Sequence, residues 1–356
     1  MTLKLAYLTV LCIGFTVQSV FSDSCPDDCI DIFDCPAAVD YLVNKLDAAS
    51  QSFLKKTNCG INPTNSHPHV CCSKLSNNID NHPNLSLLPD ACGLIDGDRI
   101  FGGKETGIYE FPWMTLISYS TRDGYKFRCG GTIINSRYIL TAAHCIVGEK
   151  VAGVRIGEHN TDSDTDCEGI PPKVICENNL QDIRVEDEIV HDAFTRIPYL
   201  KNDIALLRLK KPIDFKPKNA RAVCLPVTSE LIGRNTDRLN GTIAGWGYTE
   251  GGTSSNVLLA VRVPIYPKAN CAEIVNRGNK LAKQSLNKLC AGEINKDSCG
   301  GDSGGPLLVE GTHRGVRRYI QHGIVSYGPK QCGSLYPGIY TDVTKYMGWI
   351  LDHIKP

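Results

Sequence analysis

The chain has 356 residues, and its 38 basic side chains are balanced by 38 acidic ones, so the formal net charge is zero. This balance excludes a polybasic protein that binds nucleic acid. With 42% hydrophobic and 21% charged residues, the chain can bury a sizeable core, which excludes both a disordered chain and a membrane bundle. The 17 cysteines indicate an oxidising compartment, where disulfides form and persist.

Residues 1–22 have the pattern of a secretory signal peptide. Lys4 gives a short positive region, an apolar stretch runs from Leu5 to Val17, and the segment ending at Ser22 suits cleavage. A membrane anchor is the alternative, but the apolar stretch is shorter than the ~18 residues needed to cross a bilayer. Removing the signal takes away Cys12 and leaves an even number of cysteines, as expected for a disulfide-bonded secreted chain.

Residues 23–72 form a small cysteine-rich module. Its cysteines are Cys25, Cys29, Cys35, Cys59, Cys71 and Cys72. A domain this small buries little apolar surface, so cross-links worth about 2–4 kcal/mol each supply much of its stability. We expect one short amphipathic helix after Pro36 and otherwise loop-rich structure. Metal binding by His67 and His69 beside the vicinal cysteines is the alternative, although the C-x₂-C spacing of zinc sites is absent.

Residues 73–99 are polar and rich in turn-forming residues, and they read as a linker with one cysteine, Cys92. Residues 100–356 contain short β-branched or aromatic runs such as TLISY, YILTA, IALLRL and GIVSYG, separated by Gly, Pro and Asn turns. These runs predict an all-β barrel or sandwich. One helix is expected near the end, from Tyr346 to Ile354.

The segment GDSGGP places Ser303 between glycines. Glycines such as Gly301 adopt backbone angles closed to other residues, which lets the serine oxygen project and lets backbone N–H groups face one point. A plain glycine-rich turn is the alternative. Asp302 and Pro306 extend the match and make that alternative less favoured.

Two more segments complete a set of catalytic residue types. YILTAAHC ends in His144 and Cys145, and NDIALLRL begins near Asp203; each polar residue alone would more often be structural. Serine is a weak nucleophile that needs a base, so His144 would take the Ser303 proton and Asp203 would fix the tautomer of the base. The chain order His, Asp, Ser is that of chymotrypsin. The amides of Gly301 and Ser303 would hold the oxyanion, each worth about 2.7–4 kcal/mol.

AAHC, DIAL and GDSGGP, with IFGG after Arg99, resemble the trypsin-like serine proteases of the chymotrypsin family over residues 100–356. The six-cysteine module resembles the clip domain of arthropod clip-domain serine proteases, and the chain is similar to Easter-like and prophenoloxidase-activating enzymes. The resemblance implies an all-β fold of two six-stranded antiparallel β-barrels with a C-terminal helix, preceded by a small disulfide-rich clip domain.

The resemblance also implies a substrate preference. Asp297, six residues before the serine nucleophile, would lie at the floor of the specificity pocket, and Gly328 and Gly338 would form its small walls. A buried carboxylate there would pair with an incoming Arg or Lys. Gly300 and Tyr327 stand where many relatives have Gln and Trp, so finer subsite preferences are not inferred.

Arg99-Ile100 resembles a zymogen cleavage site. The family implies that cutting there frees the Ile100 amine, which pairs with Asp302 and orders the oxyanion hole and the pocket. Because the residue before the cut is Arg, the activator is expected to be another trypsin-like protease, and the chain is expected to belong to a cascade.

The family pattern implies most of the disulfides. They are Cys25-Cys71, Cys29-Cys59 and Cys35-Cys72 in the clip domain, Cys129-Cys145, Cys271-Cys290 and Cys299-Cys332 in the protease domain, and Cys92-Cys224 between the two chains of the cleaved protein. Cys167 and Cys176 then remain and can close a local loop. The Cys92 link implies that the clip domain stays attached after activation.

The loop GEHNTDSDTDCEG is acidic, and hard cations prefer such oxygen ligands. The equivalent loop of trypsin-like relatives binds calcium. The expected Ca²⁺ ligands are Glu158, Asn160, the Ser163 carbonyl and Asp166, with Asp162 and Asp164 as substitutes. A merely solvated acidic loop is the alternative. Asn84 and Asn240 lie in glycosylation sequons, and the basic loop HRGVRR reads as solvated or as an exosite.

Together these features predict a secreted zymogen, in haemolymph, of a serine endopeptidase that cleaves after Arg or Lys. Its substrate would be a proenzyme or procytokine of an extracellular cascade, such as prophenoloxidase activation and melanisation, Toll-type signalling or clotting. A serpin is the expected inhibitor, and neither nucleic acid nor membrane is an expected partner. The alternative is a non-catalytic clip-domain homologue that serves as a cascade cofactor or adaptor; such homologues usually lack a triad member, and this chain lacks none.

Overall fold

The structure is a computed structural model, and it divides into two compact units, residues 1–78 and 79–356. The described residues are 29–35, 38, 42, 54–55, 57–63, 65–71, 79, 82–95, 104–197, 200–248, 253–276, 287–293, 301–328 and 336–356. Outside them lie the predicted signal peptide, Cys25, Cys72, Arg99, Ile100, Asp297, Gly300, Cys299 and Cys332.

The first unit contains a small antiparallel sheet in the order β1-β3-β2. Its elements are β1 (Cys29–Asp31), the 3₁₀ helix η1 (Ile32–Asp34), β2 (Asn58–Ile61) and β3 (Pro68–Cys71). Ile32 and Val70, each 1% exposed, belong to its small core. The described residues of this unit thus include a small sheet, which the expectation of one short helix and otherwise loop-rich structure did not contain.

The metal-binding alternative for this unit finds no support in the described residues. His67 Nδ1 lies 2.9 Å from Asp31 Oδ2, so its ring is held by a carboxylate. Cys71 is disulfide-bonded, and its sulfur is not free to bind a metal as a thiolate.

The second unit begins with a closed six-stranded barrel in the order β11-β12-β7-β6-β5-β8. Its strands are β5 (Met114–Thr121), β6 (Gly124–Ile133), β7 (Tyr138–Thr141), β8 (Val151–Ile156), β11 (Gln181–Val190) and β12 (Ala205–Leu209). All of β7 is buried, whereas β11 alternates only loosely between buried and exposed residues. β7 lies between β12 and β6, so its end is well placed to hold a reactive side chain rigidly.

The second β-domain is a seven-stranded sheet in the order β15-β18-β17-β16-β13-β14-β4. Its strands are β4 (Lys104–Glu105), β13 (Asn240–Gly245), β14 (Leu259–Pro264), β15 (Lys288–Ala291), β16 (Pro306–His313), β17 (Val316–Tyr327) and β18 (Gly338–Asp342). A bridge between Ile265 and Ala291 brings the end of β14 back to β15. The six strands from β15 to β14 thus form a curled half-barrel at the place of the expected second barrel, which we call the second barrel, and β4 is an additional edge strand.

One apolar core connects the two barrels. It contains residues of both, such as Ile139 and Leu308, and aromatic side chains such as Trp113, which is 0% exposed. The predicted C-terminal helix is confirmed as α7 (Met347–His353), and its buried Ile350 and Leu351 join this core. Each such side chain contributes about 1.5–3 kcal/mol when fully buried.

The described part of the second unit contains, besides α7 and a 3₁₀ helix near its start, four further helical segments. They are α5 (Ser229–Ile232), α6 (Lys268–Asn276) and the 3₁₀ helices η3 (Ala143–Cys145) and η5 (Val343–Lys345).

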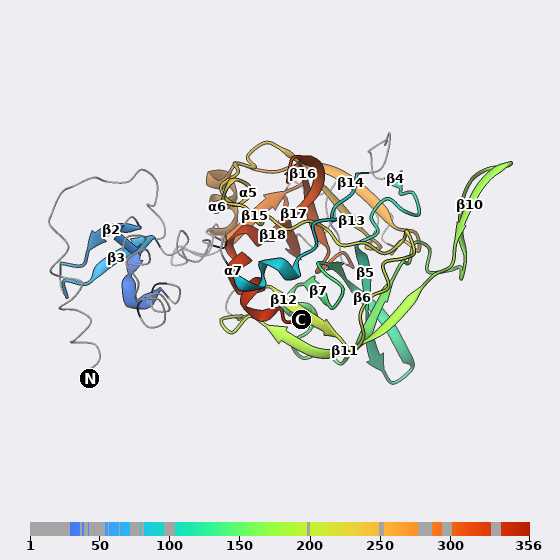
Figure 1. Cartoon of the computed structure of the whole chain (residues 1–356), viewed down its shortest axis with the longest axis horizontal. Coiled ribbons are helices and arrows are strands. Elements are labelled where there is room, and N and C mark those ends of the chain that lie inside the picture. Colours follow the sequence, from blue (N-terminus) through green and yellow to red (C-terminus); the bar gives the residue numbers. More distant parts are fainter. Residues whose placement is uncertain are drawn as a thin grey trace. The chain divides into compact units, whose positions relative to one another are not determined.

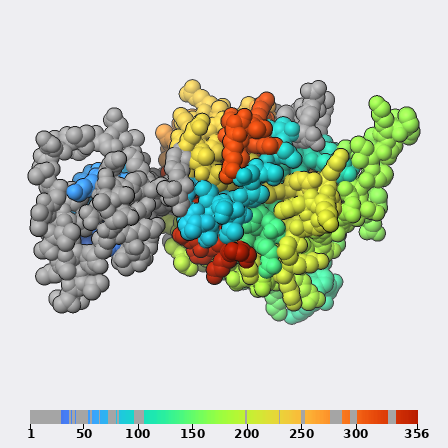
Figure 2. All heavy atoms as spheres, viewed as in Figure 1, coloured from blue at the N-terminus to red at the C-terminus, as the bar shows by residue number. Residues whose placement is uncertain are grey.

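A two-stranded hairpin, β9 (Asp166–Ile170) and β10 (Lys173–Glu177), extends away from the barrels (Figures 1 and 2). Its strands pair only with each other among the described strands, and the Cys167–Cys176 disulfide joins them. Ile170 near its tip is 81% exposed. The predicted local disulfide loop is therefore a regular β-ribbon.

Candidate active site

His144 lies just after the end of β7, in the 3₁₀ helix η3. The two alanines before it are completely buried, because small side chains fit between neighbouring strands there. The next residue, Cys145, is held in two ways. It is disulfide-bonded to Cys129, and its carbonyl accepts a 2.9 Å hydrogen bond from the Tyr119 hydroxyl. The histidine ring therefore stands on a rigid support.

Asp203 holds His144 at two points. The backbone N–H of His144 donates to Asp203 Oδ1 at 2.9 Å, and the ring nitrogen Nδ1 of His144 lies 2.8 Å from Asp203 Oδ2. The Asp203 side chain is 0% exposed, and that of His144 is 21% exposed. Burial alone would raise the pKa of Asp203, but the hydrogen bond and charge of His144, helped by Lys288 and Ser326, hold it below its usual value. An ionised Asp203 favours the His144 tautomer with its proton on Nδ1, so that Nε2, which lies 3.7 Å from Cys145 Sγ, can act as a base.

Two hydroxyl groups that the sequence analysis missed complete the surroundings of Asp203. The Ser326 hydroxyl donates to Asp203 Oδ2 at 2.5 Å, and the Thr341 hydroxyl donates to the Asp203 backbone carbonyl at 2.9 Å. Both residues are buried in the strands β17 and β18 of the second barrel. The available signal was a buried-strand pattern interrupted by a hydroxyl, as in GIVSYG.

The loop around Ser303 has the backbone geometry that its glycines predict. Gly301 and Gly304 have φ values of +101° and +80°, a region that favours glycine. A Cβ on Gly304 would lie 2.2 Å from Thr141 Oγ1. Since Thr141 ends β7, the serine loop is packed against the strand end that leads to His144. Within the described residues, no hydrogen bond joins the Ser303 hydroxyl to the His144 ring.

The Asp302 side chain packs against glycines from another part of the chain. Its Oδ1 accepts the Gly247 N–H at 2.8 Å. A Cβ on Gly245 would lie 2.1 Å from the same oxygen, and one on Gly301 would lie 2.9 Å from the Gly247 Cα. Only glycine leaves room for this carboxylate. Its expected partner after cleavage, the Ile100 amine, lies outside the described residues.

The two expected pocket walls are neighbours. Gly328 directly follows β17, and Gly338 begins β18, two paired strands in which Tyr327 lies opposite Ile339. The glycines therefore lie at adjacent strand ends near Ser326, which contacts Asp203. The pocket floor, Asp297, is outside the described residues.

Comparison with known proteins identifies the family. Residues 100–350 match the family described as Trypsin, and residues 25–72 match the family described as Regulatory CLIP domain of proteinases. The chain belongs to the clip-domain serine proteases.

Individual relatives agree along nearly the whole chain. Phenoloxidase-activating factor 1 of Holotrichia diomphalia is 38% identical over 354 residues, which cover 92% of this chain and 91% of that protein. The Spaetzle-processing enzyme of Drosophila melanogaster is 35% identical, with 92% and 89% covered. The crystal structure of the Drosophila Grass clip serine protease of the Toll pathway has a TM-score of 0.68 at 32% identity, with 92% of each chain covered. The family and the fold expected from the motifs are confirmed.

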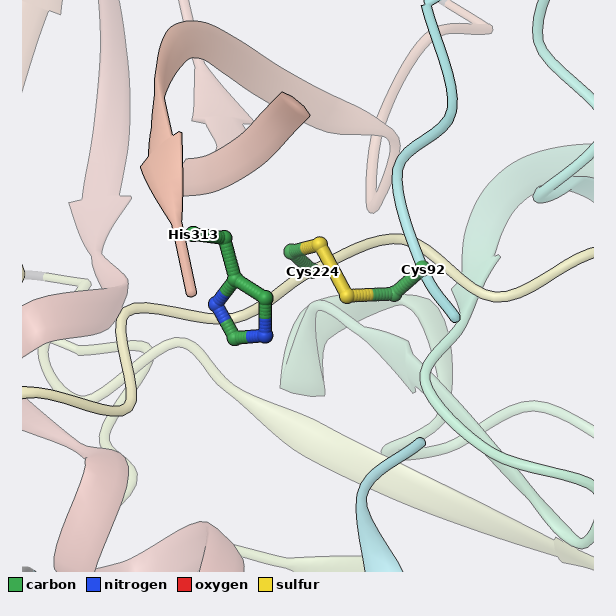
Figure 3. A group of neighbouring side chains, drawn as sticks. All are labelled: Cys92, Cys224 and His313. Atoms are coloured by element: carbon green, nitrogen blue, oxygen red, sulfur yellow. A yellow bond between two sulfur atoms is a disulfide. The ribbon is translucent and has the colours of Figure 1, made fainter. Parts of the chain in front are cut away.

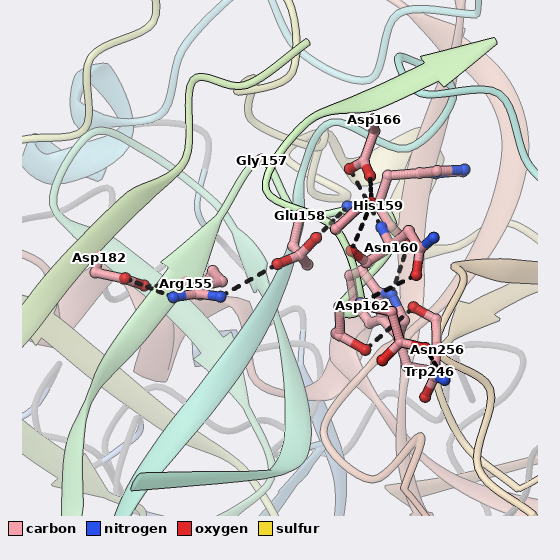
Figure 4. A network of polar contacts seen from close by, with 12 residues as sticks. Arg155, Gly157, Glu158, His159, Asn160, Asp162, Asp166, Asp182, Trp246 and Asn256 are labelled. Atoms are coloured by element: carbon pink, nitrogen blue, oxygen red, sulfur yellow. Dashed lines mark hydrogen bonds and ion pairs between the residues drawn. The ribbon is translucent and has the colours of Figure 1, made fainter. Parts of the chain in front are cut away.

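In this clip-domain protease, the acidic loop after β8 holds two buried carboxylates, Glu158 at 5% and Asp166 at 7% exposed (Figure 4). Burial raises the pKa of Glu158, and the charge of Asp166 raises it further. Asp166 accepts hydrogen bonds from the Asn160 N–H at 3.2 Å and the Ser163 hydroxyl at 2.6 Å. Arg155 Nη1 pairs with Glu158 Oε2 at 3.4 Å and supplies one positive charge, and the remaining oxygen atoms of the loop are the ligand type that a hard cation takes.

The segment before the predicted cleavage site packs on the protease unit instead of forming a free linker. Its 3₁₀ helix η2 (Pro83–Leu87) contacts α7, and the Asn84 side chain donates to the carbonyls of Leu351 and Ile354 at 2.9 and 3.1 Å. The predicted Cys92–Cys224 disulfide is present, and both cysteines are buried.

His313 lies beside that disulfide (Figure 3), and its imidazole with the two sulfurs forms a compact group of metal-ligand residue types. The sulfurs are bonded to each other, so neither is a thiolate that could bind a metal. The group is a disulfide with a neighbouring histidine.

The other described disulfides also follow the expected pairing. Cys29–Cys59, Cys129–Cys145, Cys167–Cys176 and Cys271–Cys290 are bonded. Cys35 and Cys71 are disulfide-bonded too, and their expected partners, Cys72 and Cys25, lie outside the described residues. Such a set of bonds fits an oxidising compartment. No helix in the described ranges combines the length and apolarity needed to cross a membrane.

The remaining surface features differ in accessibility. Asn240 is exposed, whereas a glycan on Asn84 would have to displace the hydrogen bonds of the Asn84 side chain to the C-terminal segment.

In the basic loop, Arg314 pairs with Asp90 at 2.6 Å and Arg317 pairs with Glu310. Neighbouring carboxylates thus partly neutralise this loop.

Proposed function

We propose that this chain is the zymogen of a trypsin-like serine endopeptidase that cleaves after Arg or Lys in a proenzyme or procytokine of an extracellular insect immune cascade. The observation that carries the proposal is the doubly hydrogen-bonded His144–Asp203 pair, with Asp203 wholly buried, beside the glycine loop of Ser303. In the reaction, His144 removes the Ser303 proton as the hydroxyl attacks the scissile carbonyl, and later returns it to the leaving amine.

The cascade setting rests on the relatives. Phenoloxidase-activating factor 1 and the Spaetzle-processing enzyme carry an activator and a processing role in their names, and Grass belongs to the Toll pathway. We extend this role to the present chain as a secreted haemolymph protease that is activated by another trypsin-like protease and inhibited by a serpin. Cleavage at Arg99 switches it on through the pairing of the Ile100 amine with Asp302.

A chromogenic arginine peptide substrate tests the activity. The secreted full-length chain is cleaved at Arg99 and compared with Ser303→Ala cleaved in the same way and with the uncleaved zymogen. We expect the variant and the zymogen to be slower by at least about 10³-fold in kcat/KM. A cleaved, folded wild type no faster than Ser303→Ala would instead support the non-catalytic adaptor.

Specificity has its own test at Asp297. Asp297→Ser removes the carboxylate that pairs with the substrate, so we expect kcat/KM for the arginine substrate to fall by about 10²–10³-fold while that for a phenylalanine substrate falls far less. An equal loss on both substrates would mean that Asp297 supports the fold and does not select the substrate.

We also propose Ca²⁺ as a structural ion of the acidic loop, held by Glu158, Asn160, the Ser163 carbonyl and Asp166. Bound calcium would neutralise the two carboxylates; the chemistry itself needs no cofactor. Chelation should lower the melting temperature of the wild type and leave that of Glu158→Gln/Asp166→Asn unchanged. Asp187→Asn, an exposed carboxylate on β11, is the matched control and should respond like the wild type. Equal melting temperatures with and without chelator would refute the site.

A further inference from the structure

A lysine lies buried behind the triad aspartate. Lys288 is the first residue of β15 and is only 6% exposed. Lysines are almost never buried this deeply without a partner, because removing an ammonium group from water is costly. Neither the acid–base chemistry of the triad nor the pocket explains why a cation stands at this position.

The Lys288 ammonium reaches Asp203 through two hydroxyl groups. Its Nζ donates to Ser326 Oγ at 3.1 Å and to Thr341 Oγ1 at 3.4 Å. The same two hydroxyls donate onward to the Asp203 carboxylate and backbone carbonyl, at 2.5 and 2.9 Å. The chain of contacts therefore runs from a cation, through hydroxyls, to the carboxylate that holds His144.

No other described charge competes for this ammonium. Among the residues that the structure describes, Asp203 is the only ionised group that shifts the pKa of Lys288; burial lowers that pKa to about 8, and the Asp203 charge opposes the shift. Asp342 on β18, and Lys268 and Glu273 on α6, belong to elements packed against β15 but have no such effect. The centroid of the uncharged Tyr327 ring on β17 lies 5.5 Å from Lys288 Nζ. At neutral pH Lys288 is thus mainly protonated.

We propose that Lys288 is a positioning residue of the triad, whose charge keeps Asp203 ionised and weakens the affinity of His144 for a proton. The proposal rests on the proposed protease function, since it assigns a role within that site. Without the lysine charge, the full negative charge of Asp203 would stabilise the His144 imidazolium, and the base would stay protonated to a higher pH.

The size of the effect follows from the distances. The hydrogen bonds place the ammonium within about 6 Å of the Asp203 carboxylate and within about 9 Å of the His144 ring. At about 8 Å, a unit charge shifts a proton equilibrium by about 0.4 pH units in a water-like dielectric and about 1.5 units at an effective dielectric of about 20. The wild type should also lose this effect above about pH 8, where Lys288 gives up its proton.

The test compares pH profiles of kcat/KM for the cleaved wild type, Lys288→Met, Lys288→Gln and Lys288→Arg on an arginine substrate. We expect the acidic limb to move about 0.4–1.5 pH units higher in the two neutral variants and to return toward the wild-type position in Lys288→Arg. A purely structural lysine would change the rate at all pH values without moving the limb. Melting temperatures show which variants are folded, and Lys288→Gln, which keeps length and hydrogen bonding, stands in if Lys288→Met is not.

A second readout does not depend on activity. In a Ser303→Ala background, the proton on His144 Nδ1 is followed by NMR as a function of pH, with and without Lys288→Gln. The neutral variant should raise the His144 midpoint by the same amount as the kinetic shift. Unchanged midpoints with an active wild type would overturn the role of Lys288 alone. An inactive wild type would overturn the protease function. The NMR titration would then still show whether the charge of Lys288 affects the proton on His144.

Discussion

Replacing Lys288 by Met should make this protease more stable at neutral pH. Burial lowers the pKa of Lys288 from 10.5 to about 8. In the folded chain the lysine therefore loses its proton near pH 8, and in the unfolded chain near its ordinary value. Between these two values the unfolded state binds more protons, so the free energy of unfolding rises with pH.

The magnitude comes from the same two values. A shift of about 2.5 units corresponds to about 3 kcal/mol. This cost is fully present below pH 8 and disappears as the pH approaches the unfolded value. Lys288→Met removes the charge and keeps a long apolar side chain in the same space. The protease unit should therefore gain up to about 3 kcal/mol at pH 7, or about 6–12 °C in melting temperature for a domain of this size, and less than about 1 kcal/mol at pH 10.

Calorimetry of the full-length chain in a Ser303→Ala background, at pH 7 and pH 10, measures the difference without self-digestion. Lys210→Met, an exposed lysine just after β12, is the matched control and should change neither melting temperature noticeably. A lower melting temperature for Lys288→Met at pH 7, or an equal gain at both pH values, would show that no costly buried charge resides at this position.

Three further predictions concern the serine loop, the linker and the glycans. Gly304→Ala should lower kcat/KM by at least about 10²-fold with nearly unchanged KM, because its Cβ would collide with Thr141 Oγ1 at the strand end below His144; steady-state kinetics on folded protein measure this. Replacing both Cys92 and Cys224 by Ala should let the Arg99-cleaved protein separate into two chains on a non-reducing gel, whereas the cleaved wild type stays one species. Enzymatic deglycosylation should remove mass from the wild type and Asn84→Gln but not from Asn240→Gln, since Asn84 is engaged with the C-terminal segment; mass loss from Asn240→Gln would contradict this.

The sequence predicted the parts of the site that its own short motifs define. Glycine at positions 301 and 304 could be interpreted directly, because positive φ angles depend on the residue type at that position. The C-terminal helix and the described disulfide pairs of the protease unit were likewise predictable. The glycines and the helix depend on backbone preferences that act within a few residues. The disulfide pairs follow from the cysteine spacing that the family shares.

The missed residues depend on contacts between distant strands. Ser326 lies 123 residues from Asp203 along the chain, and Thr341 lies 138 residues away. Only the pairing of β15 with β18, and of β18 with β17, brings their hydroxyls and the Lys288 ammonium to one residue, Asp203. A lysine that begins a strand usually reads as a solvated end residue, and nothing local in NKLCAG indicates otherwise.

The two halves of the site differ in how they are supported, and this difference bears on zymogen activation. The first barrel supports His144 through Tyr119 and the Cys129–Cys145 bond, and the second barrel supports Asp203 through Ser326 and Thr341. All of these contacts lie far from Arg99 in the sequence and already exist in the uncut chain.

The serine half has a different support. Asp302 accepts a hydrogen bond from Gly247, in a space that glycines keep open, and it directly precedes Ser303 in the chain. A new ammonium group at Ile100 would act on this carboxylate and hence on the adjacent serine and oxyanion amides. In the proposed mechanism, activation by cleavage would change the Ser303 side, while contacts from both barrels already hold the His144–Asp203 pair in the uncut chain.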